Sequence, residues 1–308
     1  MSDRTGVGLV LLSATGFGTL GIFGKLAADA GLSIPTVLAF RFLVATAAVW
    51  GWLGLRGDLR VLTGRNLAVG LGLGALGYAA VSGLYFWGLA YLTAGLAGIV
   101  LFTYPVVVVG LAVVALDERV TRRTVAALGL ALGGVVLITG GDAAGVDLRG
   151  VAVVLGAAVV YAGYITVSRT ALETVDSPTL TAHVVPAAAV SFLGYGSLTG
   201  TLSLPTGVTE WALVVGVGLV ATAVPIFTFF AGMRRIGASR ASIVSTVEPA
   251  MTLVLGAALL GEPVTSVTVV GGLLVVTGVV LVESETETET KTEPEPESES
   301  ESESEPAA

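Results

Sequence analysis

Cysteine is absent from the 308-residue sequence, histidine occurs once, and charged residues make up only 12% of it. Without cysteine the chain can form no disulfide, no thiolate metal site and no cysteine nucleophile. A soluble domain usually contains about 25% charged and about 45–50% apolar residues. Here 54% of the residues are hydrophobic and the mean hydropathy is +0.90. A soluble fold could not bury that much apolar surface, so the composition indicates an integral membrane protein.

Acidic residues are concentrated at the C-terminal end. The formal net charge is −8, but residues 283–308 alone hold 11 glutamates and a single lysine. This segment alternates glutamate with Ser, Thr and Pro and has no apolar face, so we expect a disordered, solvated cytoplasmic tail. The net charge therefore describes the tail, and no nucleic-acid partner is expected.

Long apolar stretches account for almost all of the remaining chain. A helix needs about 20 predominantly apolar residues to cross the roughly 30 Å hydrocarbon core of a bilayer. Ten such stretches follow one another with short polar joints between them, which predicts an all-α integral membrane protein with ten transmembrane helices and no soluble domain. The stretches cover approximately residues 6–28, 33–54, 67–91, 95–115, 121–139, 149–170, 178–200, 209–232, 239–260 and 265–282.

Basic residues mark one side of the predicted bundle. They gather in alternate joints, whereas the opposite joints carry mainly acidic residues, with Arg149 as the main exception. By the positive-inside rule both termini are cytoplasmic, and the helical spans predict a multi-pass protein of the plasma (inner) membrane. The eleven basic residues on the predicted cytoplasmic side are Arg4, Arg56, Arg60, Arg65, Arg119, Arg122, Arg123, Arg169, Arg234, Arg235 and Arg240.

The two halves of the sequence resemble each other. An offset of 144 residues aligns them without a gap, and 18 of the 51 pairs between residues 88–138 and 232–282 are identical. Each half contains five spans, an odd number, so the second half must enter the membrane in the opposite orientation. The identical pairs include Pro105 with Pro249 and Glu118 with Glu262.

Inverted repeats are typical of secondary transporters, because two similar units of opposite orientation can open a central site to either side in turn. The sequence therefore predicts two inverted five-helix repeats, residues 1–143 and 144–282, followed by the tail at 283–308.

The sequence resembles the EamA-type permeases of the drug/metabolite transporter superfamily over about residues 6–282. The resemblance rests on the Pro105 and Pro249 spans, each of which ends in a glutamate, as LDE at 116–118 and LGE at 260–262. It implies a central cavity lined mainly by the first four spans of each half, with the fifth spans peripheral. It does not imply a substrate, because the superfamily handles amino acids, sugars, nucleotide sugars, cations and drugs.

Two ionisable residues lie well inside predicted spans, where a charge is costly and marks a functional candidate. Arg41 and Glu248 lie at depths of roughly 12 and 14 Å from opposite faces, so they could pair across a cavity. Pro249 follows Glu248 and cannot donate to the carbonyl of Ser245, which predicts a free acceptor there. We expect Glu248 to bind a proton or a cationic substrate group while Arg41 holds an anionic group. The alternative is a buried ion pair that only fixes helix packing.

Polar and aromatic residues at helical spacing extend this candidate site. Their hydroxyls beside apolar rings suit an amino acid or an amphipathic metabolite, although tyrosines at span ends also serve as interfacial anchors. Tyr104 occupies the repeat position of Glu248. The predicted lining consists of Tyr78, Ser82, Tyr85, Tyr104, Tyr161, Tyr164 and Ser245.

Three further positions have two interpretations each. Lys25, near the outer end of the first span, either attracts solute or extends its ammonium to the interface. His183 is either a proton relay or a residue that hydrogen-bonds a neighbour. Glu118 and Glu262 lie at span ends, where helix termination explains them as well as a transport role does.

Two glycine patterns, GFGTLG at 16–21 and GLGALG at 72–77, fit the dinucleotide-binding fingerprint. Each lies inside an apolar span with no preceding strand and no acidic partner for a ribose. The sequence contains no HExxH, GxSxG or Walker motif. No cofactor, no metal, no enzymatic activity and no ATP-driven pumping are therefore expected.

The sequence predicts a secondary transporter, a permease or exporter of small organic metabolites that works by alternating access and is driven by an ion gradient or exchange. One alternative is a membrane-embedded enzyme that uses Glu248, Arg41 and His183, but their scatter over three spans lacks any metal-ligand or nucleophile spacing. Another is a non-transporting membrane assembly protein, which has little reason to keep charges in mid-membrane. The expected partners are the lipid bilayer and a small-molecule substrate. The sequence is also compatible with a homodimer.

The predicted topology can be tested with reporter fusions. A fluorescent protein fused to the C-terminus should fluoresce, and alkaline phosphatase fused there should be inactive, because the arginine-rich joints hold both termini in the cytoplasm. An active phosphatase at that end would contradict the topology.

Overall fold

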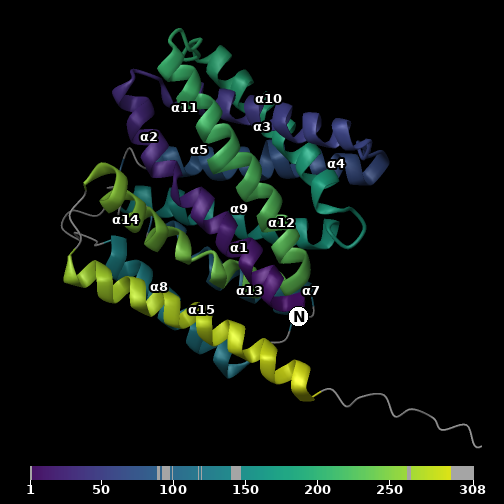
Figure 1. The fold of residues 1–308 in the computed structure, drawn as a ribbon, viewed down its shortest axis with the longest axis vertical. Helices are drawn as coiled ribbons and strands as arrows, with labels where there is room; N and C mark the ends of the chain where they lie inside the picture. The colour runs from purple at the N-terminus through teal and green to yellow at the C-terminus, as the bar shows by residue number, and fades with distance from the viewer. Residues whose placement is uncertain are drawn as a thin grey trace, which may run out of the picture.

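The computed structural model describes residues 2–88, 91, 98, 100–116, 118, 120–139, 147–261 and 265–292. All regular structure in these residues is helical (Figure 1). Two apolar helices of 10–17 residues, Tyr104–Leu116 and Val269–Leu281, accompany six stretches that are long and apolar enough to cross a membrane. The prediction of an all-helical membrane protein is thus confirmed. The six stretches are Arg4–Gly24, Ile34–Arg56, Gly64–Tyr85, Leu148–Ala171, Val208–Ile236 and Ala238–Leu259.

The helices of the first half follow the predicted spans, but the first, third and fourth spans are each divided. The break in the first lies at Thr19, the third contains a π-helical segment, η1, and the fourth has a turn at Phe102 and Thr103. The elements are α1 (Ser2–Gly18), α2 (Leu20–Asp29), α3 (Ile34–Arg56), α4 (Gly64–Gly72), η1 (Leu73–Tyr78), α5 (Ala79–Gly88), α7 (Tyr104–Leu116) and α8 (Arg122–Thr139).

The second half is divided at similar places. Its third span again contains a π-helical segment, η2, and its fourth is interrupted just before Glu248. The elements are α9 (Leu148–Ala171), α10 (Ser177–Leu198), α11 (Val208–Gly218), η2 (Leu219–Ala223), α12 (Val224–Ile236), α13 (Ala238–Val244), α14 (Val247–Leu260) and α15 (Ser266–Thr292).

Helix α15 is longer than the sequence predicts. It continues to Thr292, so that the first ten residues of the acidic segment, 283–292, are helical rather than disordered. Glutamate is a good helix former and simply extends the apolar helix that precedes it.

The two π-helical segments pack against helices of the opposite half. Gly74 and Gly218, which are 144 residues apart, lie at these contacts. A Cβ atom on Gly74 would clash with the carbonyl oxygen of Val184 in α10, and one on Gly218 would lie 2.9 Å from the carbonyl oxygen of Arg41 in α3. Since π-helical turns are frequent at functional sites, both segments draw attention to the space between the halves.

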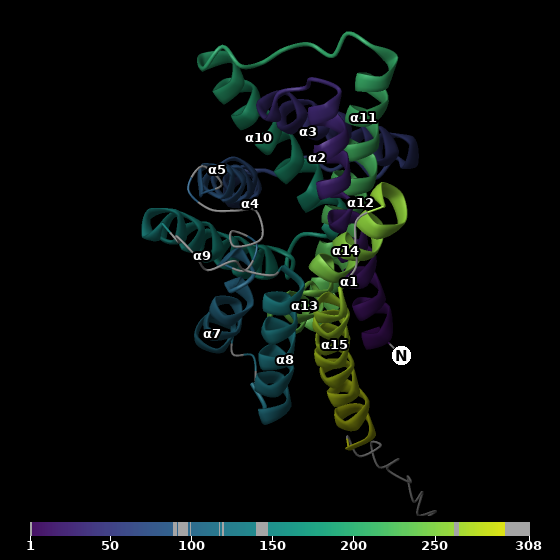
Figure 2. The ribbon, with the colours of Figure 1, turned by 90° about the vertical axis from the view of Figure 1, so that its left-hand side faces the viewer.

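Helices of the two halves intermix throughout the core. Helix α1 packs against α12 and α14, α3 packs against α10 and α11, and α7 packs against α13. Helices α8 and α15 lie side by side along one end of the molecule, where the chain's N-terminus also lies (Figures 1 and 2). The turn between α2 and α3 lies at the other end (Figure 1).

Two adjacent glycines of α8 test the packing of α8 on α15. A Cβ on Gly134 would lie 2.5 Å from the Gly271 carbonyl oxygen and 2.8 Å from the Val275 nitrogen, whereas a Cβ on Gly133 would meet no atom within 4 Å. We expect Gly134→Ala to lower the free energy of unfolding by about 1–3 kcal/mol, because overpacking against backbone is not easily relaxed. The matched control Gly133→Ala should leave it unchanged or raise it by up to about 1 kcal/mol.

Thermal unfolding of both variants in detergent, followed by circular dichroism, would compare the two changes. Equal effects of the two substitutions would contradict this packing.

Candidate functional site

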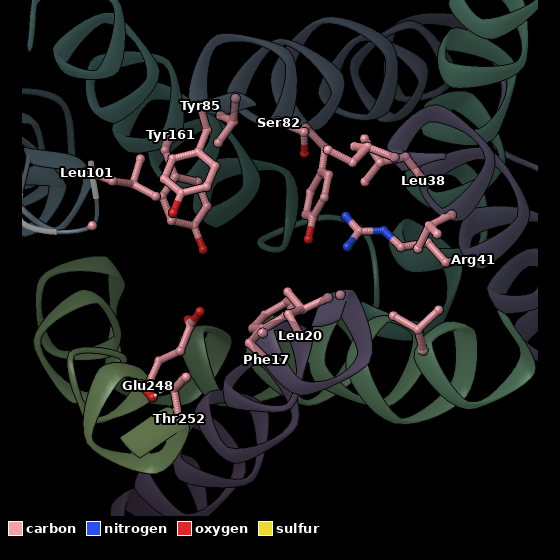
Figure 3. Close-up of a pocket in the computed structure, with 18 of the residues that line it drawn as sticks. Phe17, Leu20, Leu38, Arg41, Ser82, Tyr85, Leu101, Tyr161, Glu248 and Thr252 are labelled. Carbon is pink, nitrogen blue, oxygen red and sulfur yellow. Dashed lines mark hydrogen bonds between the residues drawn. The ribbon is translucent and has the colours of Figure 1, made fainter. Parts of the chain in front are cut away.

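A cavity of about 580 Å³ lies between the two halves, in the size range of small-ligand sites (Figure 3). Helices from both halves contribute to its wall. Seven of the predicted site residues line it together: Arg41, Tyr78, Ser82, Tyr85, Tyr104, Tyr161 and Glu248.

Arg41 faces the cavity from the middle of α3. Ser33 caps the start of this helix and Gly57, with φ 69°, ends it, so local sequence signals place the arginine. The side chain is only 6% exposed, and its guanidinium lies within electrostatic reach of the hydroxyl of Tyr78. Its Cζ atom lies 4.6 Å from the ring centroid of Phe42. Within the described residues its Nε has no hydrogen-bond partner, which leaves a buried donor available to a ligand.

Glu248 faces the cavity from the first turn of α14 (Figure 3). The helical structure is interrupted by a turn at Ser245 and Thr246, between α13 and α14. The backbone N–H of Glu248 donates to the carbonyl of Ser245 at 2.9 Å. The prediction of a free carbonyl at Ser245 is therefore wrong, because the break allows a shorter-range bond to replace the one that Pro249 removes. No side chain in the described part of the chain forms an ion pair or hydrogen bond with the Glu248 carboxylate.

Arg41 and Glu248 do not pair with each other, which corrects the expectation from their depths. They extend into the cavity from opposite sides, with open space between them (Figure 3). Tyr78 is within electrostatic reach of both charges. The alternative of a structural ion pair is therefore wrong, because the cavity itself separates the two groups.

Aromatic rings connect the surroundings of the two charges. Ring centroids are 4.5 Å apart for Tyr104 and Tyr161, 6.0 Å for Tyr161 and Tyr164, and 5.8 Å for Tyr164 and Tyr78. Edge-to-face and offset contacts of this kind stabilise each ring in one orientation. The polar groups of the cavity are thus fixed by a continuous aromatic wall.

Two predicted lining residues support that wall from behind. Tyr164 is 5% exposed and packs on Phe230 with centroids 6.1 Å apart. The Ser245 hydroxyl donates to the carbonyl of Ala241 at 2.8 Å. Neither side chain lines the cavity itself.

His183 lies outside the cavity and has both ring nitrogens occupied. Its Nδ1 is 2.8 Å from the carbonyl oxygen of Thr179, and its Nε2 accepts the backbone N–H of Leu62 at 3.1 Å. This pattern corresponds to the neutral tautomer with the proton on Nδ1. The hydrogen-bonding interpretation of His183 fits these contacts, since neither nitrogen is open to the cavity.

The side chains of two other candidates, Lys25 and Glu262, are not among the described parts of the structure. The backbone of Lys25 belongs to α2, beside the cavity residue Gly24, but its side chain lies outside the described residues, as does Glu262. Among the described residues, no group of three or more His, Cys, Asp or Glu is placed to hold a metal ion.

Apolar residues supply most of the remaining wall, and the sequence did not single them out. A leucine or phenylalanine that faces a cavity has the same hydropathy as one that faces lipid, so no periodicity separates them. The residues missed in this way include Phe17, Leu20, Leu38, Val81, Leu101, Phe102 and Val217, together with Thr252, whose hydroxyl donates to the Glu248 carbonyl.

The cavity reaches the surface beside α2 and the turn between α2 and α3, where the lining residues Gly21 and Gly24 are also exposed. Its lining extends to Ile34, which is 52% exposed at the turn between α2 and α3. At the other end α1 packs tightly on α12: a Cβ on Gly232 would lie 2.8 Å from the Gly6 carbonyl oxygen, and the Ser13 hydroxyl donates to the Pro225 carbonyl at 2.8 Å. A ligand could thus enter from the α2–α3 end.

The profile of the EamA-like transporter family matches residues 4–140 and, a second time, residues 148–284. The chain belongs to this family. An EamA-type permease was the expectation from the sequence, and it is confirmed.

Relatives of this EamA protein are named as transporters. An "Uncharacterized transporter" of Archaeoglobus fulgidus is 28% identical over 258 residues, which cover 82% of this chain and 89% of that protein. A "Probable terminal-alkyne amino-acid exporter" of Streptantibioticus cattleyicolor is 29% identical over 258 residues, 82% of this chain and 84% of that protein. A solved crystal structure shares the fold with a TM-score of 0.77 at 21% identity, covering 91% of this chain and 97% of its own. The EamA protein is a multi-pass membrane transporter and not an enzyme.

Substituting Arg41 distinguishes a ligand-binding charge from a structural one. Arg41→Met should raise the free energy of unfolding of the empty protein by about 1–3 kcal/mol, because it removes a buried charge that has no anionic partner. Removing one partner of a buried ion pair would instead lower it by about 3–5 kcal/mol. Chemical unfolding in detergent, with Arg56→Met at an exposed position as the control, would decide between the two signs.

Proposed function

We propose that this EamA protein is a permease or exporter that carries a small organic solute bearing both a negative and a positive group, by alternating access. One observation carries the proposal: Arg41 and Glu248 face a single cavity from opposite halves of the chain without touching each other. Unpaired opposite charges in an apolar site are stable only where something else completes them.

Arg41 is suited to the anionic end of the solute. A guanidinium offers a planar set of donors that matches a carboxylate, and the Nε of Arg41 has no partner within the described residues. Its contacts with Tyr78 and Phe42 hold the side chain in place before the solute arrives. Such preorganisation reduces the entropy lost on binding.

Glu248 is suited to the cationic end or to a proton. Its carboxylate meets no described cation, so closing the cavity around it without a proton or a cationic group would leave a bare buried charge. Exchange of a proton for the cationic group of the solute would couple transport to an ion gradient. The aromatic wall between the charges accommodates an apolar middle portion. The name of the Streptantibioticus relative supports an amino acid as the first solute to test.

The proposal includes ten membrane crossings in two inverted repeats of five. Support comes from the family profile, which matches the chain twice, and from the π-helical segments: Gly74 within η1 and Gly218 just before η2 are 144 residues apart. In the proposed orientation, with the termini in the cytoplasm, the α2–α3 turn would face outward, and a cavity open beside that turn would correspond to an outward-open state. Export would then require a second state that opens towards the N-terminal end.

Flux measurements in proteoliposomes test the proposal. A panel of labelled amino acids, sugars and cationic dyes should show pH-gradient-driven flux of one or more zwitterions, and Glu248→Gln should abolish the effect of the gradient because its amide cannot exchange a proton. The expected loss is on the order of 100-fold, as for the removal of a charge-assisted contact. Glu210→Gln, at a half-buried glutamate outside the cavity, serves as the matched control.

Undiminished, still proton-dependent transport by the Glu248→Gln protein would contradict the coupling role. If no solute crossed the membrane and a lipid were chemically converted instead, the transporter proposal itself would fail.

A further inference from the structure

We propose that Glu118 is a positioning residue that holds the N-terminal end of the transport cavity closed, so that opening to that side requires its carboxylate to let go of α13. The inference rests on the proposed alternating access. It assigns a role to a glutamate that lies outside the cavity and 120 residues away in sequence from its partner Ala238.

Both oxygens of the Glu118 carboxylate are engaged by the start of α13. Oε1 accepts the backbone N–H of Ala238 at 2.8 Å, and Oε2 accepts that of Ser239 at 3.1 Å. The first N–H groups of a helix have no partner within the helix, and the N-cap residue here is Gly237, which has no side chain to offer. A carboxylate from the first half therefore supplies the cap, with the charge favoured at a helix N-terminus.

The surroundings of this contact are shaped around the carboxylate. Ala238 and Ser239 are 0% and 4% exposed, so water cannot readily replace a lost partner. Gly237 has φ 81°, and a Cβ there would lie 2.8 Å from the Glu118 Oε1. A glycine is thus required both by the backbone conformation and by the approach of the carboxylate.

We call the contact between α13 and the segment made of α7 and Glu118, which follows it, the α7–α13 seam. The Glu118 carboxylate forms one end of this seam. At the other end, beside the cavity, the Tyr104 hydroxyl donates to the Ser242 carbonyl at 3.5 Å. Helix α13 then continues through the break at Ser245 into α14, whose first turn carries Glu248. The α7–α13 seam therefore lies between the cavity and the N-terminal end of the bundle. Glu118 holds α13 in place, and α13 leads directly into α14, which carries Glu248.

Opening the cavity towards the N-terminal end would have to part this seam, because α7 and α13 belong to opposite halves. Opening towards the α2–α3 turn leaves the seam intact, as the structure shows. The strength of the Glu118 contact would therefore set the balance between the two states.

The absence of cysteine makes site-directed labelling a direct test. Ser242→Cys places a reporter in the seam, where the side chain is 0% exposed, and Ser82→Cys places one in the cavity wall. Each reporter would be combined with Glu118→Ala, Glu118→Gln or Glu210→Ala in proteoliposomes. Glu210 is the matched control because its carboxylate also accepts a backbone N–H, that of Thr206 at 2.8 Å, but within its own half.

A membrane-impermeant maleimide added from the N-terminal side should label Ser242→Cys about tenfold faster in the Glu118→Ala background. Labelling of Ser82→Cys from the opposite side should fall. Glu118→Gln, which keeps one acceptor oxygen, should give an intermediate rate, and Glu210→Ala should change neither reporter.

Unchanged labelling of Ser242→Cys in both Glu118 backgrounds would overturn the inference. Faster labelling of both reporters together, with a lower melting temperature, would also overturn it, because that is the behaviour of a loosened fold. The labelling rates do not depend on the identity of the solute, so the two proposals can fail separately. If a solute is transported but the Glu118 substitutions do not change the labelling rates, the role of Glu118 alone is refuted. If the labelling rates change as expected but no solute is transported, the proposed transport alone is refuted.

Discussion

The hydrocarbon interior of a membrane solvates neither a charge nor an unpaired backbone amide, so every such group in this chain must be satisfied by the protein or by what the protein binds. Arg41 and Glu248 are two cavity-facing groups whose polar atoms the described part of the protein satisfies only incompletely. The guanidinium has Tyr78 but an unpartnered Nε, and the carboxylate has no partner in the described part of the chain. Their surroundings are organised to keep them apart across a cavity and not to neutralise them.

The same constraint explains how the helices can be interrupted beside that cavity. At the breaks, hydroxyl side chains donate to nearby carbonyls one turn earlier, as Thr19 does to Gly16 at 2.6 Å and Thr246 does to Ile243 at 2.6 Å. At the start of α13, where no local group is present, Glu118 supplies the acceptor. Irregular backbone is thus tolerated at the places where a carrier has to bend.

The all-helical membrane fold could be predicted from the sequence, because the length of an apolar stretch follows directly from membrane physics. The depth of Arg41 and Glu248 correctly indicated the cavity, but depth along a helix says nothing about lateral separation, and their pairing was predicted wrongly. His183 and Tyr164 share the residue type of a lining group yet face neighbouring helices. Phe17 and Leu38 could not be distinguished from lipid-facing residues. The role of Glu118 depends on a partner 120 residues away, for which no local pattern exists.

The central claim is that Arg41 and Glu248 are the two ends of one solute site and not partners of each other. A double-mutant cycle on the unfolding free energy of the empty protein, with Arg41→Met, Glu248→Gln and the double variant, tests it most directly. Additive effects, within about 0.5 kcal/mol, are predicted for groups that a cavity separates. A coupling free energy of about 1–3 kcal/mol would mean that the two side chains interact in the empty protein, and would contradict the account.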